Sequence, residues 1–138
     1  LAGLRLGYGL AHPETARRIG AFSARSNLNA MALVAAMASL DEPDHVERSL
    51  RMNEEARAIT NQALDELDLQ RIPSHTNFVM HEIRGDLRDY IRRMREHDVW
   101  VGRPFPPMLD YNRCSLGLAE EMAKHADTLR EFRKKGWV

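Results

Sequence analysis

Three arginines stand in settings that suit the binding of anions. Arg5 lies in a Gly-rich apolar segment at residues 4–9, Arg113 interrupts a short apolar stretch, and Arg103 precedes a Pro-rich loop. A guanidinium group is planar and donates its N–H groups as a fork, so it can bind a carboxylate or a phosphate through two parallel bonds. A charge within an apolar strand needs an anionic partner. For Arg113, that partner could equally be a ligand or a structural Asp or Glu.

The side chains that usually bind metals or attack substrates lack the spacing that such sites need. Cys114 is the single cysteine, which excludes a disulfide framework and a zinc cluster and suits a small buried apolar group. Lys124, Lys134 and Lys135 lie near the C-terminus, where they complement the dipole of a predicted helix rather than form a desolvated nucleophile. The histidines show no metal-ligand spacing; they are His12, His45, His75, His81, His97 and His125. We therefore expect no metal site.

Composition argues against two kinds of partner. The 138 residues carry 20 Lys and Arg against 20 Asp and Glu, so the formal net charge is zero and no overall field attracts nucleic acid. The longest uncharged run, residues 26–40, is too short to span a bilayer. We expect neither a nucleic-acid nor a membrane partner, and a cytoplasmic location.

Pattern and capping residues predict the elements of the first third of the chain. A short apolar segment predicts a strand at 4–10, and Pro13 suits the first turn of a helix at 13–20. After a linker at 22–29, Asn27 or Asn29 can cap a helix at 30–40. That helix is apolar nearly all round, so we expect it to be buried against the rest of the protein or against a second subunit.

The remaining residues predict a small α/β sandwich. A long helix should run from the acidic Pro-containing segment at 41–44 to about Leu67. Further helices are predicted at 85–96 and 119–135, with strands at 78–83, 99–101 and 112–116. This order implies a small sheet with helices packed on one face.

Several motifs, taken in order, resemble those of the class I and II aminotransferases, which are fold type I enzymes dependent on pyridoxal phosphate (PLP). Residues 1–9 resemble the segment that follows the catalytic lysine in Ser-Lys-x-x-Gly-Leu-Ala-Gly-Leu-Arg-x-Gly-Tyr. Residues 74–78 resemble a Ser-x-x-Asn-Phe strand entry, and residues 101–103 resemble a short strand that ends in Arg. Residues 112–117 are similar to Leu-Arg-Ile-Thr-Val-Gly. The resemblance covers nearly the whole chain and is greatest to the histidinol-phosphate aminotransferase family.

This resemblance implies a set of roles. The Schiff-base lysine would lie four residues before Leu1, so we expect the C-terminal part of an aminotransferase without a catalytic residue of its own. Arg5 would bind the phosphate of PLP and Arg113 the substrate α-carboxylate. Arg103 would hold the distal phosphate of the substrate, and Asn77 would line the pocket. The substrates would be an amino acid or amino-alcohol phosphate and a 2-oxo acid.

The resemblance also implies an assembly. Residues 1–40 would be the end of the large PLP-binding domain, and residues 41–138 would form the small C-terminal domain with a long linking helix at its start. Family members place the active site at a subunit interface, so the resemblance implies a homodimer.

Alternatives remain for the roles of the site residues, for the reaction and for the class of protein. Arg5 could be a surface residue beside a strand, and Asn77 could bond its own backbone before a strand. The Pro-rich sequence after Arg103 departs from the family, so Arg103 could be a plain loop residue. The reaction could be a decarboxylation by an enzyme of the same superfamily. The chain could instead be a non-catalytic helical module whose apolar helix at 30–40 binds a partner.

Overall fold

A computed structural model describes residues 2–23 and 27–138. The chain divides into two compact units, Leu1–Glu47 and Arg48–Val138, and each is described by itself. Part of the predicted linker at 22–29, residues 24–26, lies outside the described residues, as does Leu1.

The first unit is helical. A short 3-10 turn at Ala2–Leu4 is followed by α1 at Pro13–Gly20 and α2 at Ala30–Leu40. Pro13 occupies the first turn of α1, as predicted, where its missing N–H costs no helical hydrogen bond. Of the two candidate caps for α2, Asn29 is the one used, because its Oδ1 accepts the backbone N–H of Met31 at 2.9 Å.

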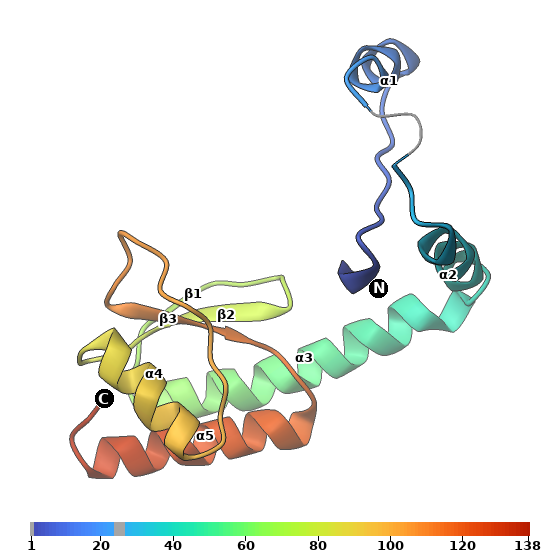
Figure 1. Ribbon diagram of the computed structural model, residues 1–138. Helices are drawn as coiled ribbons and strands as arrows, with labels where there is room; N and C mark the ends of the chain where they lie inside the picture. Colours follow the sequence, from blue (N-terminus) through green and yellow to red (C-terminus); the bar gives the residue numbers. More distant parts are fainter. Residues whose placement is uncertain (1, 24–26) are drawn as a thin grey trace. The chain divides into compact units, whose positions relative to one another are not determined.

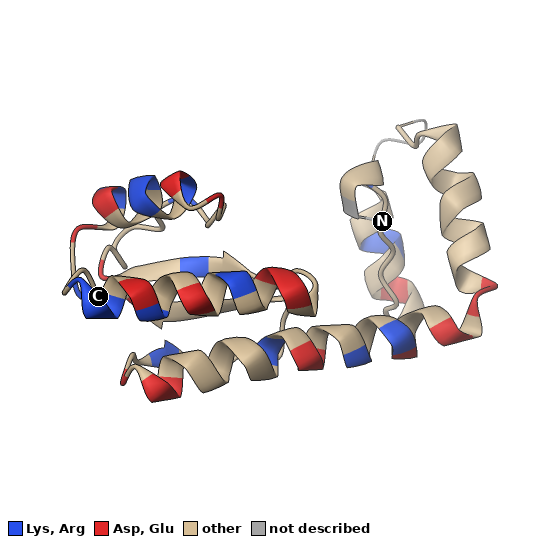
Figure 2. Ribbon diagram, turned by 90° about the horizontal axis from the view of Figure 1, so that it is seen from below, with Lys and Arg blue, Asp and Glu red and all other residues tan. Residues whose placement is uncertain are grey.

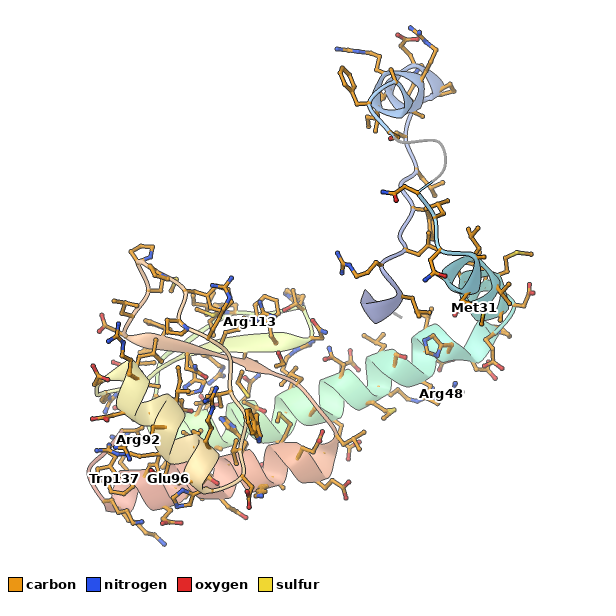
Figure 3. All side chains as sticks on the ribbon, in the orientation of Figure 1. Met31, Arg48, Arg92, Glu96, Arg113 and Trp137 are labelled. Carbon is orange, nitrogen blue, oxygen red and sulfur yellow. The ribbon has the colours of Figure 1, made fainter. Side chains whose placement is uncertain are left out.

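One expectation for this unit is wrong, and another stays a prediction. Residues 5–10 form no strand, since a strand needs a hydrogen-bonded neighbour and no described segment pairs with them. The burial of α2 against the rest of the protein or a second subunit is not tested, because α2 is largely uncovered within this chain. Ala32 is buried, but Met31 is 73% exposed and Met37 is 66% exposed. Figure 3 shows Met31 on α2. The apolar surface of α2 therefore lacks a covering surface among the described residues.

The second unit is the expected small sheet with helices on one face. Its elements are α3 (Pro43–Glu66, which begins in the first unit), β1 (Arg71–Ile72), β2 (Phe78–Glu82), α4 (Leu87–Glu96), β3 (Tyr111–Ser115) and α5 (Ala119–Lys134). The sheet is antiparallel in the order β1-β2-β3, and Val79 of β2 pairs with Cys114 of β3. The helices α3 and α5 run along one side of the sheet (Figure 1). The core joins Leu64 of α3, Met94 of α4 and Phe132 of α5 to Val79.

Alternation along β2 and β3 decides which side chains face the helices. Val79 and His81 of β2 are buried, as are Asn112 and Cys114 of β3. The residues between them are only half-buried because successive side chains of a strand point to opposite faces. Arg113 therefore lies on the face of the sheet that the helices leave uncovered (Figure 3).

Local hydrogen bonds account for most differences from the predicted elements. Residues 99–101 are no strand of the sheet, because Val99 donates its N–H to the carbonyl of Met94 at the end of α4. Helix α4 begins at Leu87 rather than at 85, since the Asp86 carboxylate caps it by accepting the N–H groups of Arg88 and Asp89. The strand β1 was not predicted, because two residues carry no alternation that could be read.

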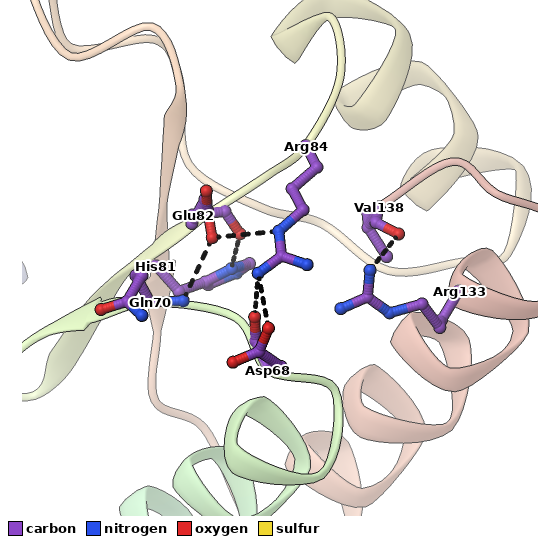
Figure 4. Close-up of polar contacts among 7 residues, drawn as sticks. All are labelled: Asp68, Gln70, His81, Glu82, Arg84, Arg133 and Val138. Atoms are coloured by element: carbon purple, nitrogen blue, oxygen red, sulfur yellow. Dashed lines mark hydrogen bonds and ion pairs between the residues drawn. The ribbon is translucent and has the colours of Figure 1, made fainter.

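Exposed ion pairs join elements of this unit. Glu66 of α3 pairs with Arg130 of α5 at 2.6 Å, and acidic and basic residues are interspersed along α5 (Figure 2). At the β1–β2 edge, Arg84 contacts both the Glu82 carboxylate at 3.3 Å and the Asp68 carboxylate at 3.1 Å (Figure 4). Exposed pairs of this kind each contribute only about 0–1 kcal/mol. Among the helices in the described residues, none combines the length and apolar character needed to cross a membrane.

Candidate functional site

The guanidinium of Arg113 lies close to two aromatic rings on the uncovered face of the sheet. Arg113 pairs with Met80 across the β2–β3 ladder. Its guanidinium carbon lies 4.5 Å from the ring centroid of Phe78 and 5.2 Å from that of Phe105. In residues 2–23 and 27–138, Arg113 makes no salt bridge with a carboxylate. The structural ion pair weighed as an alternative for Arg113 is therefore absent from the described chain.

Arg103 lies beside the same aromatic ring. Its guanidinium carbon is 4.4 Å from the centroid of Phe105, and its Nη1 donates to the carbonyl of Pro104 at 3.3 Å. The side chain is exposed. The fold thus brings together Arg103 and Arg113, which stand ten positions apart in the sequence, by placing both against Phe105.

The loop that carries Phe105 is tied to the sheet at both ends. At its start, the Gly102 N–H donates to the Arg113 carbonyl at 2.9 Å, and Asn112 Nδ2 donates to the Gly102 carbonyl at 3.2 Å. At its end, Ile83 of the β2 side donates its N–H to the Asp110 carbonyl at 2.8 Å. The predicted Pro-rich loop is therefore a fixed turn. Sequence reasoning missed Phe105, although an aromatic residue two positions after Arg103 was a usable signal.

Asn77 stands immediately before Phe78, next to the aromatic face that Arg113 contacts. Its backbone carbonyl accepts the N–H of Leu116 at 2.9 Å. Its side chain is exposed and, within the described residues, makes no hydrogen bond with its own backbone. That structural alternative is therefore not observed. The turn is held instead by the Ser74 and Thr76 hydroxyls, which donate to the Phe78 carbonyl at 2.5 and 3.2 Å.

Arg5 belongs to the first unit, whereas the other candidate residues belong to the second. Its side chain is exposed, and its backbone adopts a φ of 58°. Around the neighbouring glycines Gly3 and Gly7, no described atom lies within 4 Å of the position that a Cβ would occupy. A guanidinium can donate charge-assisted hydrogen bonds to a phosphate dianion, so Arg5 fits the phosphate of a cofactor in donor chemistry.

The buried titratable groups lie on the opposite, helix-covered side of the sheet. His81 Nδ1 donates to the Glu82 carbonyl at 2.9 Å, so its Nε2 accepts the Tyr90 hydroxyl at 3.5 Å. Burial lowers the pKa of His81 to about 4 and that of His125 to about 3. Burial also raises the pKa of the Cys114 thiol to about 12. Neutral imidazoles and a protonated thiol in the core serve packing rather than proton transfer to a ligand.

A concave region lies beside α3 and β1, and neither Arg103 nor Arg113 lines it. This cavity of about 510 Å³ is lined by both acidic and basic groups, among them Arg57, Asp65 and Arg71. The Arg71 guanidinium already pairs with the Asp65 carboxylate. Ser74 and His75 of the Ser-x-x-Asn-Phe segment line it, whereas Arg103, Arg113 and Asn77 do not. The described residues hold no group of three or more His, Cys, Asp or Glu side chains that could bind a metal ion.

The lysines are placed on the surface of α5. Lys124 Nζ donates to the Asp98 carbonyl at 3.3 Å, and Lys135 pairs with the Glu131 carboxylate. Lys134 is exposed. The three lysines are therefore solvent-accessible, and the candidate anion-binding groups of the second unit remain Arg103 and Arg113.

Comparison with known proteins shows the family to which this sequence is similar. Residues 1–127 match the model of the family described as "Aminotransferase class I and II". The chain is 34% identical to histidinol-phosphate aminotransferase 1 of Nitrosococcus oceani over 96% of its own length and 37% of that protein. It therefore spans less than two fifths of that relative.

Solved structures of aminotransferases are also similar to this chain. The fold superposes with a TM-score of 0.92 and 40% identity on an Erwinia carotovora atroseptica protein provisionally described as a histidinol-phosphate aminotransferase. That match covers all of this chain and 40% of the other. A histidinol-phosphate aminotransferase of Sinorhizobium meliloti, solved with pyridoxal-5'-phosphate, matches with a TM-score of 0.82 and 26% identity over 98% of this chain and 38% of that one. The chain belongs to the class I and II aminotransferases, whose cofactor is pyridoxal phosphate.

Proposed function

We propose that this chain is the C-terminal part of an aminotransferase that moves an amino group between an amino acid or amino-alcohol phosphate and a 2-oxo acid. In this proposal, residues 1–40 complete a large cofactor-binding domain, and residues 41–138 form the small domain. The full-length enzyme would be a cytoplasmic homodimer, and its catalytic lysine would lie outside this chain. The relatives named histidinol-phosphate aminotransferases support this range of substrates.

One observation supports the proposal that Arg113 binds a carboxylate of the substrate. Arg113 is a half-buried cation whose two neighbouring groups are aromatic rings, and it has no carboxylate partner among the described residues. Aromatic rings contact the face of a guanidinium, whereas its N–H groups point outward in its plane. The in-plane donors therefore remain available for a carboxylate. We assign that carboxylate to the substrate, with Arg103 as the second anion-binding group.

The remaining roles follow from the same chemistry. When bound, pyridoxal phosphate supplies an electron sink for the charge that develops at the substrate carbon. In the proposed enzyme, Arg5 anchors the cofactor phosphate through charge-assisted hydrogen bonds. Arg113 orients the substrate carboxylate, Arg103 selects the group at the far end of the substrate, and the exposed amide of Asn77 forms part of the pocket wall. Orientation of this kind supplies a large share of catalysis.

Kinetics of the full-length enzyme test these roles. We would screen L-amino acids and histidinol phosphate as donors with 2-oxoglutarate as acceptor, and compare the wild type with Arg113→Lys. Lysine keeps the charge but loses the fork. The loss of one bond of a charged bidentate pair costs about 1.5–3 kcal/mol, so KM should rise about ten- to a hundredfold with the cofactor retained.

Two companion variants separate the other assignments. Arg5→Lys should weaken cofactor retention, measured by the absorbance that remains after dialysis, and Arg103→Ala should change which donor is preferred. If Arg113→Lys leaves KM unchanged but lowers the thermal midpoint, Arg113 is a structural residue and the substrate assignment is wrong. Product analysis in the same screen separates the transfer of an amino group from the release of carbon dioxide.

A further inference from the structure

Phe105 occupies a position that no motif predicted. Its ring is contacted by both candidate anion-binding arginines, with Arg103 at 4.4 Å and Arg113 at 5.2 Å from its centroid. Both distances are within the range at which a cation is attracted to the face of an aromatic ring. One phenyl ring therefore limits the movement of two guanidinium groups that come from different segments of the chain.

Backbone hydrogen bonds fix the position of Phe105. Its carbonyl accepts the N–H of Met108 at 2.9 Å, and the two residues form a β-bridge across a tight turn. The turn belongs to the loop that Gly102 ties to Arg113 and that Asp110 ties to Ile83. The ring is half-buried although the loop lies on the surface. Phe105 can therefore hold a flexible side chain in place, because its own backbone is fixed on both sides.

Arg113 gains the most from this arrangement. An arginine side chain loses considerable rotamer entropy when a ligand immobilises it. Here Phe78 and Phe105 already contact the guanidinium of Arg113, which lies on the uncovered face of the sheet (Figure 3). These rings carry no hydrogen-bond acceptor atom of their own, so the N–H donors of Arg113 remain available to an anion. Preorganisation of this kind strengthens binding without adding a contact to the ligand.

We propose that Phe105 is a positioning residue that holds Arg113 and Arg103 in the orientation that binds the substrate carboxylate and the distal group. The proposal rests on the substrate role assigned to Arg113. Phe105 acts through the arginines and needs no contact with the substrate. The loss of its ring should therefore weaken the binding of dicarboxylates and leave the turnover of the bound substrate nearly unchanged.

The test uses the full-length, cofactor-loaded enzyme. Succinate, a dicarboxylate that cannot react, serves as the probe in isothermal titration calorimetry, and 2-oxoglutarate serves as the acceptor in kinetics. Phe105→Leu should raise the Kd for succinate and the KM for 2-oxoglutarate about three- to tenfold, with kcat within twofold of wild type. Phe105→Tyr keeps the aromatic face and should restore both constants.

Replacement of Phe105 by a ring-fluorinated phenylalanine keeps the shape but removes the negative ring face. It should reproduce the weakening seen with Phe105→Leu, and it keeps the test decisive if the leucine variant folds poorly. The matched control is Trp100→Leu. Trp100 is 79% exposed and stacks with Arg95 at 4.9 Å. Removal of this cation–π pair should leave both constants unchanged.

The outcomes separate this inference from the proposed function. If Arg113→Lys weakens succinate binding but neither Phe105→Leu nor the fluorinated variant does, Phe105 is no positioning residue and the role of Arg113 stands. If Arg113→Lys leaves succinate binding unchanged, the substrate assignment itself fails and the role of Phe105 fails with it. A fluorinated variant that binds like wild type while Phe105→Leu binds weakly would show that Phe105 acts through shape alone, which also overturns the proposed stacking.

Discussion

Gly102 donates its backbone N–H to the carbonyl oxygen of Arg113 at 2.9 Å, and a Cβ at Gly102 would overlap that same oxygen. The close approach joins the start of the Pro-rich loop to the strand that carries the candidate carboxylate-binding residue. Only glycine permits it without movement of the backbone, because the atom in the way belongs to the main chain.

Gly102→Ala should therefore lower stability by about 1–3 kcal/mol, as expected when atoms are forced into a filled space. The loop would have to move away from Arg113, so KM for 2-oxoglutarate should rise as well. Thermal unfolding and steady-state kinetics check the two effects. The control is Gly20→Ala at the end of α1, where the added Cβ meets no described atom within 4 Å. A stable Gly102→Ala enzyme with the wild-type KM would show that the loop tolerates the displacement.

The second prediction concerns pH. His81 and His125 have pKa values lowered to about 4 and about 3 by burial, whereas an unfolded histidine titrates near 6.5. Between these values the unfolded chain binds more protons than the folded chain, so stability should fall as pH falls from about 7 towards 4. At pH 5, each histidine should account for roughly 2 kcal/mol of this loss.

His125→Met tests this effect, because methionine is close in volume to histidine and cannot be protonated. His125 is suited to replacement, since neither ring nitrogen has a hydrogen-bond partner among the described residues. The loss of unfolding free energy between pH 7 and pH 5 should be smaller in the variant by about 2 kcal/mol. His97 is a useful comparison: contacts with the Arg93 carbonyl and Glu131 raise its pKa, so its replacement should not reduce the loss. An unchanged pH dependence in His125→Met would contradict the assignment.

The third prediction concerns the 138-residue chain expressed alone. It should form no stoichiometric bond with pyridoxal phosphate, because its lysines are exposed or paired on the surface of α5 rather than held in a desolvated site. Borohydride reduction followed by peptide mapping measures this, and the full-length enzyme should be labelled at one site. Stoichiometric labelling of Lys124, Lys134 or Lys135 would refute the prediction.

The fourth prediction concerns assembly. The apolar side chains of α2, including Met31, Val34 and Met37, are exposed in this chain and leave a surface that other parts of the full-length protein or a second subunit must cover. We expect the full-length enzyme to be a homodimer at micromolar concentration. Light scattering coupled to gel filtration should give twice the mass of one chain. A monomeric mass under these conditions would contradict the predicted homodimer.

Local signals predicted the elements that local chemistry determines. Proline in a first turn and an Asn cap correctly placed the starts of α1 and α2, and the strand predicted at 78–83 is found as β2. The strand predicted at 4–10 was wrong because its formation depends on a pairing partner that these residues do not contain. The helix at 30–40 was identified correctly as helix, but its burial could not be decided from its own residues.

The candidate site, like the fold, could be predicted only in part from the sequence. The types and neighbours of Arg103 and Arg113, together with the family motifs, were enough to select both residues as anion-binding candidates. Their shared contact with Phe105 was not predictable, because it depends on the strand register that puts Arg113 opposite Met80 and on the turn that returns Phe105 to the sheet. Motifs and caps are properties of neighbouring residues in the chain. The meeting of three side chains over one sheet face is decided by tertiary packing, which no short stretch of sequence contains.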